Sequence, residues 1–239
     1  MTNVLITGAN RGFGLEMTRR YSERDGVSVI ACCRSPDGAN ELAAVAKDNP
    51  NITIEQLDVS DAGSVAALKA RLGDLPIDIL INNAGIFGKN PPATTGFSDQ
   101  VFGNSDFEND WIKPYRVNVI GPMQMVEAFS DNVAASGLKK IAIITSIVGS
   151  IALASGGMFG YAASKAAANM VSRNLAMALK DRDIIVNPIH PGYAKTDMGG
   201  EGAHVEVADA IAGVMDQIDR MTLADTGKFL SFDNRDLPW

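Results

Sequence analysis

Short apolar runs alternate with helix-length segments from one end of this 239-residue sequence to the other. The apolar runs are nearly continuous in valine, isoleucine and leucine, which is typical of parallel strands covered by helices on both faces. The alternation predicts an α/β fold, a Rossmann-type, doubly wound parallel sheet of about seven strands that binds its ligand at the carboxyl ends of the strands. The expected strands are Val4–Ile6, Val27–Cys32, Ile52–Leu57, Ile77–Ile81, Lys140–Ile144, Ile184–Pro188 and Phe229–Leu230. The expected helices cover residues 12–24, 39–48, 62–72, 106–135, 158–181 and 204–219.

The sequence contains no internal repeat and no low-complexity linker, so we expect residues 1–239 to form a single domain. Two irregular, glycine-containing loops near residues 86–105 and 193–204 are expected at the ligand-bearing edge of the sheet, where loops carry specificity. We expect the segment Asp197–Ala203 to act as a lid.

The net charge of −7 argues against a nucleic-acid or anionic-membrane partner, because both need clustered lysine and arginine. Cys32 and Cys33 are adjacent, which leaves no separated pair for an intrachain disulfide. The N-terminus lacks a signal-peptide pattern and no apolar stretch has membrane-spanning length. We therefore expect a soluble, cytoplasmic protein. His190 and His204 belong to no ligand cluster, so we expect no metal.

A glycine-rich turn directly follows the first expected strand. Gly8 permits a tight turn, Gly12 lets the backbone approach a pyrophosphate, and Gly14 allows the next helix to pack near the strand. The N-terminus of that helix offers N–H donors to an anion. Because the glycine spacing differs from the general dinucleotide fingerprint, a glycine-rich turn without a ligand is the alternative interpretation.

The end of the second expected strand normally carries an acidic residue that binds the adenosine ribose. Arg34 stands there instead, and a guanidinium can bind a 2′-phosphate in a bidentate fork that a carboxylate would repel. Arg11 can approach the same phosphate, so the sequence predicts NADP(H) as the cofactor. The alternatives are that Arg34 is a solvated charge and that Asp37 binds the ribose hydroxyls.

Together with later motifs, these features resemble the short-chain dehydrogenase/reductase family, in the family's order and over nearly the whole chain. The motifs are Thr7–Gly14, Asp58-Val59, Asn82-Asn83-Ala84-Gly85, Asn118, Ser146, Tyr161 with Lys165, and Pro191-Gly192 with Thr196. The segments His190–Gly200 and Asp236–Trp239 look like those of the sniffer and C-factor carbonyl reductases. Ser146 and Tyr161 stand slightly further apart than is usual in the family, with the extra residues in Ile151–Phe159.

The resemblance implies most of the residues that we expect in the site. The expected catalytic residues are Asn118, Ser146, Tyr161 and Lys165. The cofactor-binding residues are Gly8, Asn10, Arg11, Gly12, Phe13, Gly14, Arg34, Asp58, Val59, Asn83, Ala84, Gly85, Tyr161, Lys165, Pro191, Gly192 and Thr196. It also implies that Lys165 holds the ribose hydroxyls and that Asn118 anchors a water. Without the resemblance, Asn118 would be read as a helix residue with a local backbone bond.

Tyr161 and Lys165 suit carbonyl reduction because the reaction needs a proton donor near the oxygen. Lys165 follows Tyr161 by one helical turn on the same face. A phenol has a pKa near ~10, and bringing it to about 7 requires roughly 4 kcal/mol, which a cation at ~4 Å can supply at an effective dielectric of ~20. Ser146 can donate to the substrate oxygen. The alternative for the pair is an ordinary helix surface.

We therefore expect an NADP(H)-dependent oxidoreductase that transfers hydride between the cofactor and a carbonyl or secondary alcohol, with Tyr161 as acid and base. One alternative is a C-factor-type regulatory protein that binds NADP(H) with little turnover. A nucleotide-sugar epimerase or dehydratase is disfavoured because the chain after Pro191 is too short for a larger substrate domain. The expected partners are a small-molecule substrate and further copies of the chain, as a dimer or tetramer. An apolar rim suggests a hydrophobic carbonyl; its residues are Phe87, Phe97, Phe102, Met158, Phe159, Tyr193 and Met198.

Overall fold

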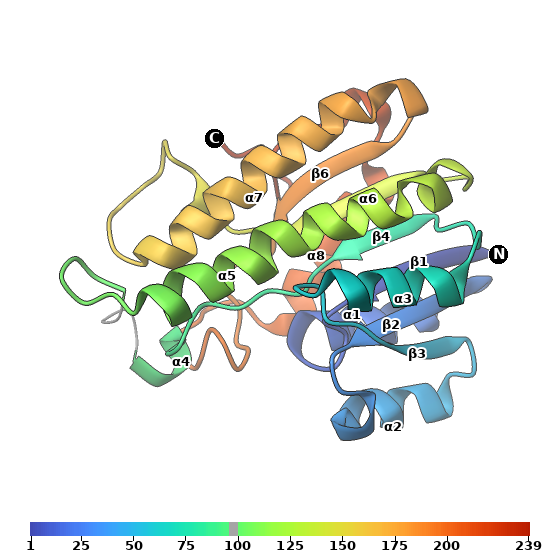
Figure 1. Ribbon diagram of the computed structural model, residues 1–239, viewed down its shortest axis with the longest axis horizontal. Coiled ribbons are helices and arrows are strands. Elements are labelled where there is room, and N and C mark those ends of the chain that lie inside the picture. Colours follow the sequence, from blue (N-terminus) through green and yellow to red (C-terminus); the bar gives the residue numbers. More distant parts are fainter. Residues whose placement is uncertain (96–99) are drawn as a thin grey trace.

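Seven parallel strands form one sheet in the order β3-β2-β1-β4-β5-β6-β7 (Figure 1). The computed structural model describes residues 1–95 and 100–239, so the expected rim residue Phe97 lies outside the described part of the chain. The strands are β1 (Thr2–Thr7), β2 (Val27–Cys33), β3 (Ile52–Gln56), β4 (Ile79–Asn82), β5 (Lys140–Ile144), β6 (Ile185–His190) and β7 (Leu230–Ser231). The order reverses between β1 and β4, which is the place where doubly wound sheets open a crevice for ligands.

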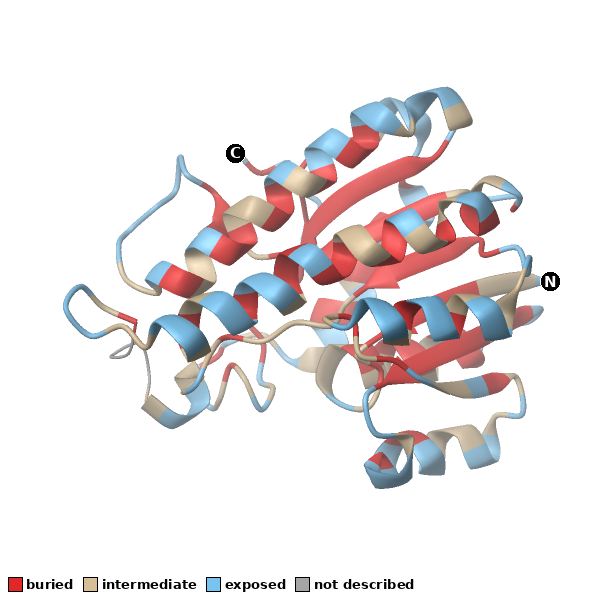
Figure 2. Cartoon of the chain, in the orientation of Figure 1, coloured by how far each residue is buried: buried red, intermediate tan, exposed pale blue. Residues whose placement is uncertain are grey.

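Helices cover both faces of the sheet and bury nearly all of the strands (Figure 2). One apolar cluster joins the sheet to α1, α2 and α8, and a second joins its other face to α3, α6 and α7. The helices are α1 (Gly12–Ser22), α2 (Asn40–Asp48), α3 (Ala62–Leu72), α4 (Pro92–Thr95), α5 (Lys113–Tyr115), α6 (Gly121–Ala134), α7 (Phe159–Ala178) and α8 (Val207–Arg220). No helix in residues 1–95 or 100–239 combines the length and the hydrophobicity needed to cross a membrane.

The predicted α/β class, the parallel sheet and its seven strands are confirmed. The main difference lies in the expected helix over residues 106–135, which is not uniformly α-helical. Two π-helical segments, η2 (Phe107–Ile112) and η3 (Arg116–Ile120), flank α5 and lead into α6. Apolar periodicity cannot reveal such a local widening, and π-helical turns are frequent at functional sites. The four-residue α4, which the sequence did not predict, lies within the loop near residues 86–105. This loop is called the first rim loop below, and the loop near residues 193–204 the second rim loop.

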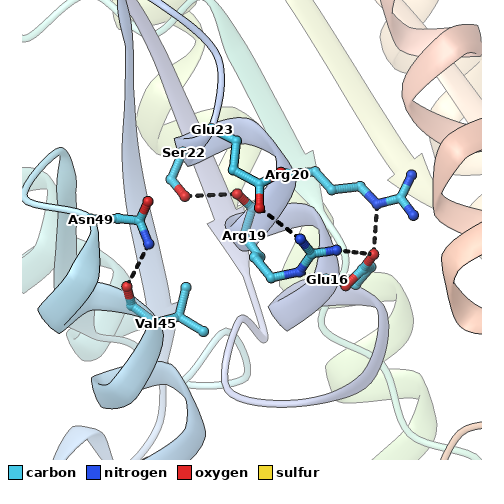
Figure 3. Close-up of polar contacts among 7 residues, drawn as sticks. All are labelled: Glu16, Arg19, Arg20, Ser22, Glu23, Val45 and Asn49. Carbon is cyan, nitrogen blue, oxygen red and sulfur yellow. Dashed lines mark hydrogen bonds and ion pairs between the residues drawn. The ribbon is translucent and has the colours of Figure 1, made fainter.

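The helix α1, which begins in the glycine-rich turn, is stabilised by a carboxylate shared between two arginines (Figure 3). Glu16 accepts hydrogen bonds from Arg19 at 2.8 Å and from Arg20 at 2.6 Å. Burial raises the pKa of Glu16, but the hydrogen bonds and charges of the two arginines outweigh it and leave the pKa below its usual value. These contacts lie at positions i+3 and i+4 of one helix face, away from the turn, and leave the N-terminus of α1 unobstructed.

The imidazole of His190 at the end of β6 is buried, with 8% of its surface exposed. Burial lowers its pKa to about 4, with Asp233 opposing and Arg235 assisting the shift. Its Nδ1 has no hydrogen-bond partner among the described residues. A neutral imidazole is therefore built into the folded state.

We predict that His190 makes the protein less stable as the pH falls from about 6.5 to about 4. Because the pKa of His190 is lower in the folded than in the unfolded chain, the unfolded chain binds the proton first as the pH falls. The resulting loss in the free energy of unfolding is absent above this pH window and reaches about 3 kcal/mol below it. The melting temperature of the parent and of His190→Gln, measured at neutral pH and near pH ~4.5, tests this. The variant should lose less stability on acidification than the parent, and an equal loss in both would contradict the prediction.

Candidate active site

The expected site residues gather at the carboxyl edge of the sheet, beyond the ends of its strands. The glycine-rich turn follows β1, Asn83 follows β4, Ser146 follows β5 and Pro191 follows β6. Parallel strands bring these ends together because they all point the same way. The site is therefore assembled from segments far apart in sequence.

The three glycines of the turn have different geometric roles. Gly8 has φ +67°, and a Cβ there would lie 2.9 Å from the Cα of Ala84. A Cβ on Gly14 would lie only 2.2 Å from the carbonyl oxygen of Gly8. Gly12 has φ +53° but meets nothing nearer than the methyl group of Thr196, at 3.8 Å. Gly8 and Gly14 are thus required by close packing, whereas Gly12 is favoured by its left-handed backbone.

The N-terminus of α1 is left open for an anion. Its N-cap residue, Arg11, has an extended backbone and makes no side-chain capping bond, and no acidic residue occupies the first turn. The first N–H groups of a helix lack partners within the helix and favour negative charge. Together with the uncrowded backbone at Gly12, this arrangement fits the pyrophosphate of a dinucleotide.

A hydrogen-bond network fastens the glycine-rich turn to the end of β4. The hydroxyl of Thr7 accepts from the backbone N–H groups of Asn83 and Ala84, each at 3.0 Å. The side chain of Asn83 donates to the carbonyl oxygens of Thr7 at 2.9 Å and of Gly8 at 3.2 Å. Thr7 was not singled out from the sequence, although its place at the end of a strand immediately before Gly8 could have marked it.

Tyr161 and Lys165 lie on α7 and face the end of β5. Lys165 is 5% exposed, and its Nζ donates to the carbonyl oxygen of Ile144 at 3.0 Å and lies 5.7 Å from the centre of the Tyr161 ring. The hydroxyl of Ser146 lies near enough to the phenol of Tyr161 to lower its pKa. The ring of Phe87 packs against that of Tyr161 with 4.8 Å between centroids. The structure thus brings the proposed acid, its hydroxyl partner and the lysine into one place.

Burial controls the ionisation of this group. It raises the pKa of Tyr161 to about 12, with the Ser146 hydroxyl opposing the shift, and it lowers the pKa of Lys165 to about 8. The sequence analysis expected the lysine to bring the phenol toward neutrality. The direction found is the opposite, because desolvation of the phenolate dominates and Nζ donates to the Ile144 carbonyl rather than to the phenol.

Asn118 lies in the π-helical segment η3 and joins the first rim loop to α7. Its Oδ1 accepts from the N–H of Ile86 at 2.9 Å, and its Nδ2 donates to the carbonyl oxygen of Ile86 at 2.9 Å and to the hydroxyl of Ser164 at 3.0 Å. A Cβ on Gly85 would lie 3.4 Å from this Oδ1 and 3.5 Å from Nζ of Lys165. Asn118 therefore stands beside the lysine and holds the backbone after β4.

The two candidate phosphate-binding arginines differ in their surroundings. Arg34, directly after β2, is exposed, and its carbonyl oxygen accepts from the Gln56 side chain. Arg11 is also exposed but forms an ion pair of 3.1 Å with Asp197 in the second rim loop. Asp58, at the end of β3, accepts from the N–H and hydroxyl of Ser60, and Val59 is buried against Gly121. The Arg11–Asp197 contact was not foreseen.

The second rim loop is tied down at several points. Tyr193 donates its hydroxyl hydrogen to the carbonyl oxygen of Gly199, and the N–H of Gly199 donates to the hydroxyl of Thr196. The N–H of Ala93 in α4 donates to the carbonyl oxygen of Met198 at 3.1 Å. A ring carbon of Phe232 would lie 2.9 Å from a Cβ on Gly192, next to the buried Pro191. The expected lid is thus docked on the first rim loop rather than detached from it.

The chain is similar to known proteins in sequence and in architecture. The family model described as short chain dehydrogenase matches residues 2–206. The crystal structure of NADPH-bound carbonyl reductase from chicken fatty liver is 31% identical, with a TM-score of 0.88 over 100% of this chain and 99% of that one. Carbonyl reductase Sniffer of D. melanogaster is 27% identical, with a TM-score of 0.87 and full coverage of both chains. C-signal of Myxococcus xanthus is 31% identical over 165 residues, 69% of this chain and 93% of that protein.

The sheet, the reversal of strand order between β1 and β4 and the glycine-rich turn define a Rossmann-type α/β protein. The family match makes it an oxidoreductase. Within that class, the chain belongs to the short-chain dehydrogenase family. The resemblance to the sniffer and C-factor proteins inferred from the sequence is confirmed.

We predict that Gly14→Ala destabilises the protein by about 1–3 kcal/mol, because its new methyl group must displace the Gly8 carbonyl and the Asn83 side chain. The free energy of unfolding in denaturant measures the effect. Gly137→Ala is the matched control, since its Cβ would meet the Asp78 carboxylate at an ordinary 3.7 Å. Equal stability of the two variants would show that close packing at Gly14 is not limiting.

Proposed function

We propose that this protein is an NADP(H)-dependent oxidoreductase that interconverts a carbonyl and a secondary alcohol. The observation that carries the proposal is the group formed by Ser146, Tyr161 and the buried Lys165 at the carboxyl edge of the sheet. The relatives support the class of reaction, since the chicken and Drosophila proteins are carbonyl reductases and the former is NADPH-bound.

The proposed cofactor-binding residues follow the edge of the sheet. The glycine-rich turn and the open N-terminus of α1 would hold the pyrophosphate, with contributions from Asn10 and Phe13. Arg34 and Arg11 would hold the 2′-phosphate, and Asp58 with Val59 the adenine. On the nicotinamide side we propose Asn83, Ala84, Gly85, Pro191, Gly192 and Thr196, with Tyr161 and Lys165 at the ribose.

NADPH, when bound, supplies the hydride that reduces the carbonyl carbon. The hydroxyl of Ser146 orients the substrate oxygen and stabilises negative charge on it. Tyr161 then donates its phenolic proton to that oxygen. The Lys165 ammonium favours the phenolate that remains, and Asn118 keeps the backbone beside the lysine in place.

The ionisation of the site favours reduction at neutral pH. With its pKa raised to about 12, Tyr161 carries the proton that reduction consumes. Alcohol oxidation needs the phenolate, so its rate should rise with pH. With a pKa of about 8, Lys165 is mainly protonated at neutral pH and loses its charge in mildly alkaline solution.

We further propose a single domain over residues 1–239, in the cytoplasm, that forms a homo-oligomer. Exposed apolar side chains on η2, η3 and α7 support self-association. They are Ile112, Ile120, Met170 and Met177.

The second candidate function, a regulatory protein with little turnover, is favoured by the similarity to C-signal alone.

The first test is Tyr161→Phe, which removes the proton donor and keeps the ring that packs on Phe87. We predict a fall in kcat of about 10²-fold or more, with the Kd for NADPH changed less than about twofold. Turnover is measured as NADPH consumption over a panel of aldehydes, ketones and quinones. Tyr115→Phe, an exposed tyrosine on α5, is the control and should keep full activity. A Tyr161→Phe variant as active as the parent would refute the assignment.

The cofactor preference gives a second test. A charge-assisted bond from Arg34 to the 2′-phosphate is worth about 1.5–3 kcal/mol, which predicts at least a tenfold preference for NADPH over NADH in kcat/KM. Arg34→Asp should reverse the order, because it replaces a partner of the phosphate with a repelling charge. Lys47→Asp on α2 changes the net charge equally at an exposed site and should leave the order unchanged. A parent enzyme that prefers NADH would show that the phosphate site is misplaced.

A further inference from the structure

The first turn of α7, which carries Tyr161, is capped by a residue 61 positions earlier in the sequence. The N–H of Phe159 donates to the backbone carbonyl oxygen of Gln100 at 3.1 Å, and the N–H of Tyr161 donates to its side-chain Oε1 at 2.9 Å. The N-cap residue of α7, Met158, provides no side-chain cap. Gln100 therefore satisfies N–H groups at the start of the helix that the helix itself leaves without partners.

The same amide group also holds the residue that packs on the Tyr161 ring. The Nε2 of Gln100 donates to the carbonyl oxygen of Phe87 at 2.9 Å, and the Phe87 ring lies 4.8 Å from that of Tyr161. Gln100 is 1% exposed and Phe87 is 4% exposed. One buried side chain thus contacts the backbone of Tyr161 on one side and the aromatic neighbour of its ring on the other.

The surroundings keep Gln100 in an unfavourable backbone conformation. Its φ is +56°, a left-handed value that glutamine rarely adopts. A Cβ on Gly88 would lie 2.6 Å from the Gln100 amide nitrogen and 2.6 Å from Oδ1 of Asp110, so a larger residue there would displace these side chains. The same Oδ1 of Asp110 accepts from the N–H of Lys89 at 2.9 Å. Such a conformation persists only when its neighbours determine it, and it is found most often at functional sites.

Both polar atoms of the Gln100 side-chain amide make contacts that bear on Tyr161. The oxygen accepts from the N–H of Tyr161, and the nitrogen donates to Phe87, whose ring packs on the phenol. Displacing this segment of the rim loop would remove the cap from α7 and shift Phe87 at the same time. A displacement of about 1 Å at a reacting group can reduce turnover by as much as about 10²-fold.

We infer that Gln100 is a positioning residue for Tyr161, which couples the conformation of the first rim loop to the alignment of the phenol. The inference rests on the proposed function of Tyr161 as the proton donor. A substrate that contacts the rim loop would then influence the alignment of the donor through Gln100. Gln100 would act through the backbone of Tyr161 and through Phe87.

The experiment compares Gln100→Met with a matched control, Gln217→Met. Gln217 on α8 is also buried. Its amide donates to the carbonyl oxygen of Ser231 at 2.9 Å and to Oδ1 of Asn234 at 2.8 Å. Both variants should lower the melting temperature by a similar amount, because each loses two buried hydrogen bonds. Only Gln100→Met should lower kcat, by about tenfold or more, while the Kd for NADPH stays within about twofold of the parent.

Gln100→Glu separates the two contacts and also serves if Gln100→Met does not fold. It keeps an oxygen that accepts from the N–H of Tyr161 and loses the donor to Phe87. Its kcat should lie between those of the parent and Gln100→Met. A kcat within twofold of the parent in both Gln100 variants, or an equal loss of kcat in Gln217→Met, overturns the inference.

Amide hydrogen exchange provides a readout that needs no substrate. The N–H of Tyr161, which loses its acceptor, should exchange at least tenfold faster in Gln100→Met than in the parent, and at the parental rate in Gln217→Met. The N–H of Phe159 is an internal reference, because its acceptor is the backbone carbonyl oxygen of residue 100, which the substitution keeps. Unchanged exchange would show that Gln100 does not cap α7. Tyr161→Phe, assayed on the same substrate, distinguishes the two failures. If Tyr161→Phe is inactive and Gln100→Met is fully active, the positioning role alone fails. If Tyr161→Phe is fully active, the proposed function fails as well.

Discussion

The parallel register of β1, β4, β5 and β6 is the constraint on which the rest of the site depends. Ile6 stands beside Ile81 in β4, Ile81 beside Ala142 in β5, and Ala142 beside Asn187 in β6. The next few residues of each strand therefore leave the sheet at the same edge. A shift of one residue in any of these strands would turn its side chains to the opposite face, and a shift in β5 would separate Ser146 from Tyr161.

The close packing of α7 on the end of β5 is the second condition. A Cβ on Gly149 would lie 2.6 Å from the backbone of Lys165, and one on Gly160 would lie 1.9 Å from the carbonyl oxygen of Asp110. These small residues let α7 approach both the turn after β5 and the helical run before α6. Lys165 becomes buried as a result, and the loss of hydration that lowers its pKa follows from the same packing that places it near Tyr161.

Much of the fold could be predicted from the sequence, because continuous valine and isoleucine runs such as Val27–Cys33 report burial on both sides. The glycine-rich turn could be predicted because only glycine permits the contacts at Gly8 and Gly14. Gln100 could not, since its contacts with α7 depend on tertiary structure and on a left-handed backbone that the sequence does not signal. The direction of the Tyr161 pKa was also beyond reach, because it depends on how deeply the phenol is buried.

The ion pair between Arg11 and Asp197 raises the question of whether it competes with the proposed phosphate contact. Both side chains are mostly exposed, at 62% and 74%, and exposed pairs of this kind contribute only about 0–1 kcal/mol. A charge-assisted hydrogen bond from a guanidinium to a phosphate contributes about 1.5–3 kcal/mol. The phosphate contact is therefore the stronger of the two, and Arg11 can leave Asp197 for it at small cost. Since Asp197 belongs to the second rim loop, which is docked on α4 through Met198, such an exchange would reach the first rim loop as well. The two arginines proposed for cofactor choice would thus be unequal: Arg34 would act locally, whereas Arg11, through Asp197, would also affect the two rim loops.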